Sequence, residues 1–533
     1  MPMAKTTKAP APASFHLTYA TMFDPPEALH RSFERALAQT KANLGREYPM
    51  VIGGRDVLAA DKFTDTSPID RDWKLGVFQK GTAQHARDAI AAARAAFPKW
   101  SAMPWPRRVA LLRKASALFT KRAFAIAAAD CLEVGKNRME ALADVQETAD
   151  LIAYYCDQVA ANKGYVKPLK KDPLKGYTAR NHSVLRPYGV WIVISPFNFP
   201  VALAGGPIGG ALVAGNTVVF KPATDTPWTG HLLARCFLDA GLPPGVVNFV
   251  TGPGSTVGQE LMSNPDVDGI TFTGSYDVGM KILRTFAAGV APRPCIAEMG
   301  GKNPVIVSKR ADLDIAALGV YRSAFGLQGQ KCSATSRIFV ERPAYDAFVT
   351  KLRALLEGTA IGDPTSRENW LGPVINDGAA RDFEGFCAEL KASGTILHGG
   401  TRLSAGALAK GSFCAPTLAT APESHRLWKV EMFLPIAMIA PVDSLDDAMR
   451  RANDVEYGLT AGFYGTTKES QWFFDHIQAG VCYANRPQGA TTGAWPGHQP
   501  FGGWKGSSST GKGAGSIYYV PQYLREQSRT LVE

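Results

Sequence analysis

The chain lacks the short signatures that would indicate a metal centre, a redox pair or a membrane anchor. None of its eight cysteines is spaced as Cys-x-x-Cys, and there is no His-Glu-x-x-His, so neither a zinc site nor a redox disulfide is indicated. No run of 18 or more residues is both apolar and uncharged. The start, MPMAKTTKAPAPASF, has no apolar core of the kind found in secretory signals. We therefore expect no metal, no membrane partner and reduced thiols in a cytoplasmic protein.

Charge of one sign is in excess, but it is not concentrated. The formal net charge is +11. The densest basic stretch, at 167–180, is short and interrupted by proline and glycine. Nucleic-acid binding needs basic residues that cluster with aromatic residues or within a known motif. We therefore interpret the charge as a solvated surface and expect no nucleic-acid partner. A nucleic-acid-binding protein stays open as a weaker alternative.

What is present indicates a large α/β protein. The 533 residues are enough for two or three domains. Residues 1–45 resemble a tail followed by a helix, and residues 81–160 carry apolar side chains at helical spacing. From 186, short β-branched runs that end in glycine or proline (GVWIVISP, GNTVVFKP, GVVNFVTG, GITFTGS) alternate with helical stretches. A second such series begins near 300. This alternation predicts βαβ units and parallel sheets.

Ligands on such sheets bind beyond the carboxyl ends of the strands. Asn198, Lys221, Gly252 and Gly274 follow or end successive predicted strands. Each of the two loops TGPGSTVGQE and FTGSYDVG also places a glycine at a strand end and a hydroxyl just before a helix, where free amides can bind phosphate. The Gly-x-Gly-x-x-Gly fingerprint is absent, so either loop alone is a weak signal.

Cys332 is the candidate nucleophile. It follows a Gly-Gln-Lys turn and precedes a predicted strand. A thiol nucleophile needs access to solvent and a lowered pKa, which we expect Lys331 and free backbone amides to provide. Taken alone, a cysteine in a large enzyme is more often a core residue.

Two further residues suit the chemistry of a thiol enzyme. Glu298 lies between an apolar strand end and a glycine pair, where apolar surroundings would raise its pKa and make it a general base. Asn198 could donate its amide to a developing oxyanion. Each has a plainer interpretation, as a turn-capping carboxylate and as an ordinary turn residue. For Lys221, which could meet a cofactor hydroxyl or phosphate, the plainer interpretation is a solvated lysine.

Taken together, these segments resemble the NAD(P)-dependent aldehyde dehydrogenase superfamily. FNFP, GNTVVFKP, FTGS, EMGGKN, GQKCSA, EMFLP and PFGG occur in the order that the superfamily shows, over about 45–530. The 34-residue interval from Glu298 to Cys332 and the 23-residue interval from Asn198 to Lys221 also match. The resemblance implies an α/β fold with a Rossmann-type cofactor domain, a second α/β catalytic domain and a β-strand oligomerisation arm. The implied boundaries are an extension at 1–45, a cofactor domain at 46–166 and 186–298, a catalytic domain at 299–505, and an arm at 167–185 and 506–533.

The resemblance also implies roles for residues. Cys332 would attack the aldehyde, Asn198 and the Cys332 amide would form the oxyanion hole, and Glu298 would activate the water that hydrolyses the thioester. The presence of Glu298 favours a hydrolytic enzyme over one that transfers the acyl group to coenzyme A. The cofactor would be NAD or NADP. Its implied contacts are Ser195, Pro196, Phe197, Lys221, Ala223, Thr224, Gly254, Gly258, Phe272, Thr273, Gly274, Ser275, Val278, Met299, Gly300, Glu431 and Phe433.

Within the superfamily the chain is most similar to 1-pyrroline-5-carboxylate (glutamate γ-semialdehyde) dehydrogenases. The supporting segments are LEVGKNRMEALADVQETAD, SAFGLQGQKCSATSR, TTGAWPGHQPFGG and the long N-terminal extension. By that resemblance Ser333, Gly493 and Ala494 would hold the substrate carboxylate, Glu147 its amino side and Phe325 its aliphatic stem. A homodimer or a higher homo-oligomer is implied as well.

Several positions depart from the superfamily pattern. Pro207 stands where many members have lysine, and Phe197 where many have tryptophan. Leu434 replaces a usual glycine. The loop with Trp495-Pro496 is unusual, so another ω-semialdehyde or an aromatic aldehyde stays open as substrate. Thr224 replaces the glutamate of NAD-selective members, which leaves NADP acceptable. A non-catalytic paralogue is the remaining alternative, and the joint presence of Cys332, Glu298 and Asn198 argues against it.

Overall fold

The computed structural model describes residues 17, 22, 25–173, 175–490 and 493–533. Most of the tail predicted at the N-terminus lies outside the described residues, as do Thr491 and Thr492 of the TTGAWPG segment. The helix predicted to follow the tail is present as α1 (Glu27–Lys41), which begins directly after Pro26. In the described part of the chain no helix is long and apolar enough to cross a membrane.

The first large sheet has seven strands in the order β12-β11-β8-β9-β10-β2-β3. The run from β12 to β10 is parallel, as the strand–helix alternation predicted, and β2 and β3 extend it in antiparallel fashion. Its strands are β2 (Met50–Ile52), β3 (Arg55–Val57), β8 (Val190–Ile194), β9 (Thr217–Lys221), β10 (Val247–Phe249), β11 (Gly269–Thr273) and β12 (Cys295–Glu298).

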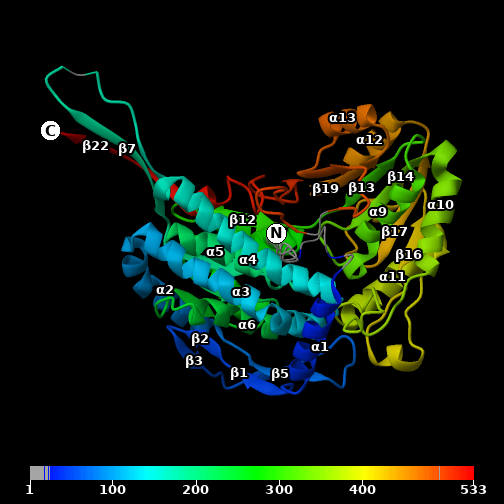
Figure 1. Cartoon of the computed structure of the whole chain (residues 1–533), viewed down its shortest axis with the longest axis horizontal. Coiled ribbons are helices and arrows are strands. Elements are labelled where there is room, and N and C mark those ends of the chain that lie inside the picture. Colours follow the sequence, from blue (N-terminus) through cyan, green and yellow to red (C-terminus); the bar gives the residue numbers. More distant parts are fainter. Residues whose placement is uncertain (1–16, 18–21, 23–24, 174, 491–492) are drawn as a thin grey trace, which may run out of the picture.

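Helices cover both faces of this sheet, which explains why its strands are apolar at consecutive positions. In β8, Val190 and Ile192 pack on one face, and Trp191 and Val193 on the other. The first face is covered by α2 (Ala83–Ala102), α7 (Gln259–Ser263) and α8 (Tyr276–Ala287). The second is covered by α5 (Ala202–Ala214) and α6 (Pro227–Asp239), with α3 (Trp105–Val134) and α4 (Arg138–Ala161) outside them (Figure 1).

A buried ion cluster joins α3, α4 and α5. The Lys136 ammonium lies 2.9 Å from Asp130 and 2.6 Å from Asp144, and all three side chains are fully buried. The other Asp144 oxygen accepts a hydrogen bond from the Ala202 amide at 2.7 Å. The cluster therefore fixes the start of α5, which directly follows the Asn198 turn.

We expect Lys136→Met to lower the free energy of unfolding by about 3–5 kcal/mol, because it leaves two carboxylates buried without their cation. Urea unfolding measures the loss. Arg113→Met breaks the exposed Arg113–Asp157 pair and is the matched control, with an expected cost below about 1 kcal/mol. Equal losses in the two variants would show that burial does not set the strength of the cluster.

The second large sheet follows in the chain and has the order β15-β16-β17-β14-β13-β19-β20. All its pairs are parallel except β15-β16. One face packs on α9 (Leu313–Phe325) and α10 (Arg342–Glu357), the other on α11 (Asp377–Ser393), α12 (Leu445–Asn453) and α13 (Thr467–His476). Its strands are β13 (Asn303–Val307), β14 (Thr335–Glu341), β15 (Thr395–His398), β16 (Thr417–Thr420), β17 (Ile436–Val442), β19 (Thr460–Tyr464) and β20 (Val481–Ala484).

Three smaller sheets complete the described part of the fold. β6 (Val166–Pro168), β7 (Ala179–Pro187) and β22 (Leu524–Val532) form the projecting arm at the upper left of Figure 1. A sheet of β1 (Arg46–Tyr48), β5 (Lys74–Gln79) and β4 (Lys62–Thr66) was not predicted from the sequence. The third pairs β18 (Tyr457–Gly458) with β21 (Trp504–Lys505). The exact domain boundaries given above stay a prediction.

Candidate active site

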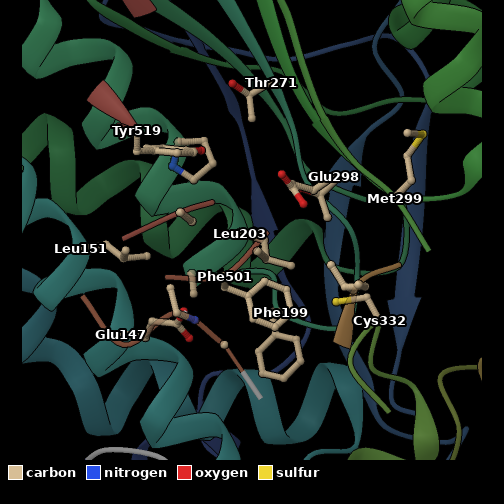
Figure 2. A pocket seen from close by; sticks show the side chains of 17 residues that line it. Glu147, Leu151, Phe199, Leu203, Thr271, Glu298, Met299, Cys332, Phe501 and Tyr519 are labelled. Atoms are coloured by element: carbon tan, nitrogen blue, oxygen red, sulfur yellow. The ribbon is translucent and has the colours of Figure 1, made fainter. Parts of the chain in front are cut away.

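Cys332 and Glu298 line the same cavity, although 34 residues separate them in the chain. The cavity offers about 40 Å³ to the centres of water molecules, which is room for about three waters. Figure 2 shows the Cys332 sulfur on one side of the Glu298 carboxylate and Glu147 across the cavity. Most of the remaining lining is apolar, with Leu151, Phe199, Leu203, Pro207, Met299, Leu459 and Phe501 among its members. A thiol, a carboxylate and a water-sized space are thus brought together.

The turn that carries Cys332 is held from several directions. The Asn303 side-chain amide donates to the Cys332 carbonyl at 2.7 Å and to the Ala334 carbonyl at 2.8 Å. The Asn198 amide donates to the Gln330 carbonyl at 2.9 Å, so Asn198 lies against the same turn. Gln328, just before the turn, has a φ of +54°, a conformation that a residue with a side chain adopts only under constraint. The nucleophile is therefore rigidly placed.

The expectation of a lowered thiol pKa was wrong for this structure. Burial, with the Glu431 and Glu298 carboxylates nearby, raises the pKa of Cys332 to about 12. The Lys331 ammonium pairs with Glu140 at 3.8 Å, deep in the protein. The sequence places Lys331 beside Cys332, but it could not show that the Lys331 ammonium would form an ion pair with Glu140 on α4. The thiol is accordingly protonated at rest.

Glu298 ends β12 and has one satisfied and one unsatisfied oxygen. Oε1 accepts a hydrogen bond from the Ser508 hydroxyl at 2.9 Å. Oε2 is buried and has no hydrogen-bond partner among the described residues. Burial raises the pKa of Glu298 to about 8, while the Ser508 hydroxyl and the Gly503 amide oppose that rise. Ser508 was missed from the sequence, because nothing local links it to a residue 210 positions away.

The residues predicted to bind the substrate divide into two groups. Glu147, Gly493 and Ala494 line the cavity. The Ala494 amide, expected to meet a substrate carboxylate, instead donates to the Glu147 carboxylate at 2.6 Å. Phe325 is fully buried in the core of the second sheet, and Ser333 is buried with its Oγ unpartnered among the described residues. The cavity lining, as far as the structure describes it, includes neither of these two.

The predicted cofactor residues gather at the carboxyl ends of the first sheet. Lys221 ends β9, and its ammonium donates to the Pro222 carbonyl at 3.1 Å, while burial lowers the pKa of Lys221 to about 8. Ser195 follows β8, and its buried Oγ has no partner in the described chain. Ser275 is the N-terminal cap of α8 with no side-chain capping bond. A lysine, a free hydroxyl and a helix N-terminus are a donor set that suits a dinucleotide.

Glu431 and Phe433 are the residues expected to hold the nicotinamide side of the cofactor. One Glu431 oxygen accepts a hydrogen bond from the Gly301 amide at 2.8 Å, and burial raises the pKa of Glu431 to about 7. Glu431 leaves no room for a side chain at Gly300, because an added Cβ would lie 2.0 Å from its Oε2. Phe433, at a φ of +57°, meets the Phe197 ring edge-to-face at 5.8 Å. A cleft of about 660 Å³ runs from Ser275 to Glu431.

The remaining predicted cofactor residues surround these groups. Thr224 is exposed in the turn between β9 and α6, and the neighbouring Asp225 accepts a hydrogen bond from the Asn376 side chain at 3.2 Å. Gly254 and Gly258 bound a single π-helical turn, and Val278 is exposed on α8. Pro196, Ala223, Phe272, Thr273, Gly274 and Met299 lie at or just beyond strand ends. Within the described residues no group of three or more potential ligands could hold a metal ion.

Comparison with known proteins decides the family. The sequence profile described as "Aldehyde dehydrogenase family" matches residues 58–528. This chain is an aldehyde dehydrogenase. Both the superfamily resemblance and the predicted α/β fold are thereby confirmed, and the protein is an oxidoreductase.

Individual aldehyde dehydrogenases resemble the chain over nearly its full length. It is 36% identical over 514 residues to 1-pyrroline-5-carboxylate dehydrogenase of Geobacillus thermodenitrificans (strain NG80-2), covering 95% of this chain and 97% of that protein. A solved structure of 1-pyrroline-5-carboxylate dehydrogenase from Thermus with bound NAD superposes with a TM-score of 0.90 at 35% identity, covering 97% and 99% of the two chains. An NADP-dependent enzyme of E. coli gives a TM-score of 0.84 at 31% identity, covering 92% and 99%.

Proposed function

We propose that this aldehyde dehydrogenase oxidises its substrate through a thiohemiacetal and a thioester on Cys332. The observation that carries the proposal is the shared cavity of Cys332 and Glu298, with Asn198 tied to the turn that holds the thiol. Asn198 has a second amide hydrogen to offer an oxyanion beside its bond to Gln330. Glu298 takes a proton from the water that attacks the thioester.

We infer that the cofactor is NAD or NADP. Lys221, Ser195 and Ser275 would hold its phosphates and ribose, and Glu431 with Phe433 would hold its nicotinamide end. When bound, it accepts the hydride that leaves the thiohemiacetal carbon. The relatives solved with bound NAD or named for NADP support both possibilities. Thr224 carries no negative charge that would repel a 2′-phosphate.

Glutamate γ-semialdehyde is the proposed substrate. The support comes from the full-length similarity to 1-pyrroline-5-carboxylate dehydrogenases and from Glu147, Gly493 and Ala494 in the cavity lining. An aldehyde with an apolar body, such as an aromatic aldehyde, is a second candidate. The apolar lining favours it, as does the occupation of the Ala494 amide by Glu147.

A panel of aldehydes tests the substrate. We expect kcat/KM for glutamate γ-semialdehyde to exceed that for succinic semialdehyde and for benzaldehyde by at least about tenfold, because each buried polar contact left unmade costs that much or more. Each aldehyde is measured with NAD and with NADP. A higher kcat/KM for benzaldehyde would support the second candidate instead.

We also propose that the arm joins subunits into a homodimer or a higher homo-oligomer. β22 pairs with β7 along nine residues and exposes Leu531 and Val532 near its end. Exposed strands of this kind are usually covered by a partner. The eight cysteines are all free, which supports the proposed cytoplasmic location. A small-molecule aldehyde is the only other partner proposed.

A further inference from the structure

A chain of hydrogen-bonded side chains leads to the cavity from the first sheet. The Trp191 indole donates to the Thr271 hydroxyl at 2.9 Å. The Thr271 and Tyr523 hydroxyls are 3.1 Å apart, and the Tyr523 hydroxyl donates to Tyr519 at 3.0 Å. All four side chains are buried, so water does not compete for these bonds. Thr271 and Tyr519 both line the cavity that holds Glu298 and Cys332.

The direction of this chain follows from the bond between Tyr523 and Tyr519. An indole N–H can only donate. Tyr523 has a single hydroxyl hydrogen, which it gives to Tyr519, so the Thr271 hydrogen must go to Tyr523. Every hydrogen is then used except the last one, on the Tyr519 hydroxyl. No described residue accepts it within hydrogen-bonding distance, and aligned bonds of this kind strengthen the terminal donor.

Packing holds the Tyr519 ring in place. It stacks on the Tyr155 ring at 5.1 Å between centroids, and the Tyr155 hydroxyl is bound separately by the Gly515 amide at 3.1 Å. Gly210 of α5 leaves room for the rings of Tyr523 and Tyr519, because a Cβ added at Gly210 would lie 2.9 Å from the first ring and 3.4 Å from the second. The free hydrogen therefore comes from a rigid donor.

Glu298 supplies the matching acceptor. Among the residues that the structure describes, its Oε2 is buried without a hydrogen-bond partner, and no hydrogen bond joins it to the Tyr519 hydroxyl. Both residues line a space with room for about three waters. In Figure 2 the Glu298 carboxylate lies between Tyr519 and Cys332. A negative charge on Glu298 also raises the pKa of Tyr519, as expected if the two groups are close.

We propose that Tyr519 is a positioning residue for thioester hydrolysis, donating through one water of the cavity to Glu298 Oε2. This donation favours the ionised carboxylate and fixes its orientation, and the inference rests on the function proposed above. In the step itself, the oxygen of a second water bonds to the acyl carbon and one of its protons passes to Glu298. The C–S bond then breaks, which releases the carboxylic acid and the Cys332 thiolate.

Other titratable groups could influence the same carboxylate. Lys331, which pairs with Glu140, and Lys302, which interacts with Glu431, are cations in the described surroundings, but neither shifts the pKa of Glu298. The other groups carry no positive charge. They are Cys332 and Glu147 in the cavity, Glu431 beside the thiol, and Tyr155 and Tyr523 beside Tyr519.

The test compares Tyr519→Phe with Tyr155→Phe in the full-length enzyme with cofactor and aldehyde. Acylation is followed as reduced cofactor in a single turnover, and hydrolysis as loss of the acid-stable thioester, from pH 6 to about 10. In Tyr519→Phe we expect the rate of acylation to be unchanged and thioester hydrolysis to be about tenfold slower at pH 7. The pH range over which the hydrolysis rate rises (the rising limb of its pH profile) should lie about one pH unit higher than in the wild type. Tyr155→Phe keeps the wild-type limb. Thr271→Val, which removes the hydroxyl two members before Tyr519 in the chain, shows a smaller shift in the same direction.

Two results would overturn the inference. One is a pH profile of hydrolysis in Tyr519→Phe whose rising limb lies at the wild-type pH, and the other is an equal displacement of that limb in Tyr519→Phe and Tyr155→Phe. Should Tyr519→Phe fail to fold, an unmoved limb in Thr271→Val has the same meaning. Failure of the proposed function is recognised separately, because the wild-type enzyme would then form no thioester at all.

Discussion

Replacing Cys332 by alanine is expected to abolish aldehyde-dependent reduction of NAD or NADP, with a fall in kcat of at least about 10⁴-fold. Without the sulfur no tetrahedral thiohemiacetal forms, so the aldehyde carbon has no hydride ready to leave. Absorbance at 340 nm under saturating aldehyde measures the loss. Asn303 and Asn198 bind backbone carbonyls of the turn, not the sulfur, so the variant should keep its fold.

Cys482→Ala provides the matched control. Cys482 is half-buried on β20, and its thiol donates to the Ala479 carbonyl at 3.4 Å. We expect full activity in that variant. Retained activity in Cys332→Ala, or equal losses in the two variants, would exclude the thiol mechanism.

The resting state of the thiol imposes a condition on the mechanism. A pKa of about 12 means that Cys332 carries its proton at neutral pH. Two of the causes are the neighbouring carboxylates Glu431 and Glu298, so protonation or displacement of either one lowers the barrier to ionisation. Glu431 also lines the cleft of about 660 Å³ that begins at Ser275.

The fold could be predicted from the sequence where local pattern and tertiary packing agree. The β8 segment is apolar at every position because helices cover both of its faces, and that pattern is visible in the sequence. The meeting of Cys332 and Glu298 in one cavity followed from the family spacing. The strand-end rule gave only the positions of Asn198, Lys221, Gly252 and Gly274, whereas the longer set of cofactor contacts came from the superfamily resemblance and stays a prediction.

Contacts made by distant segments could not be predicted. Ser508 and Tyr519 reach the site because residues 506–519 fold back against β12 and β11, and no periodicity encodes that return. The Lys331 charge was misjudged because Glu140 lies on a helix 191 positions earlier. The hydrogen bond from the Ala494 amide to the Glu147 carboxylate likewise depends on how the loop that contains Ala494 packs against α4.

Glu298→Gln should separate the two halves of the reaction. Acylation and its single turnover of reduced cofactor should stay within a few-fold of wild type, while thioester hydrolysis falls by about 10³-fold because no base takes the proton of the attacking water. The expected record is a burst of reduced cofactor followed by very slow turnover, with acyl-enzyme trapped by acid and detected by mass spectrometry. A variant without any burst would assign Glu298 to acylation instead.

The pH dependence of hydrolysis gives the second half of this prediction. A base works only when deprotonated, and burial raises the pKa of Glu298 to about 8, so wild-type hydrolysis should rise with pH through about 8. In Glu298→Gln that limb disappears. Ser508→Ala is the matched control: it keeps the carboxylate but removes the donor that lowers its pKa, so the limb should persist at higher pH. A wild-type rate that stays flat from pH 6 to 9 would mean that the water loses its proton to some other group.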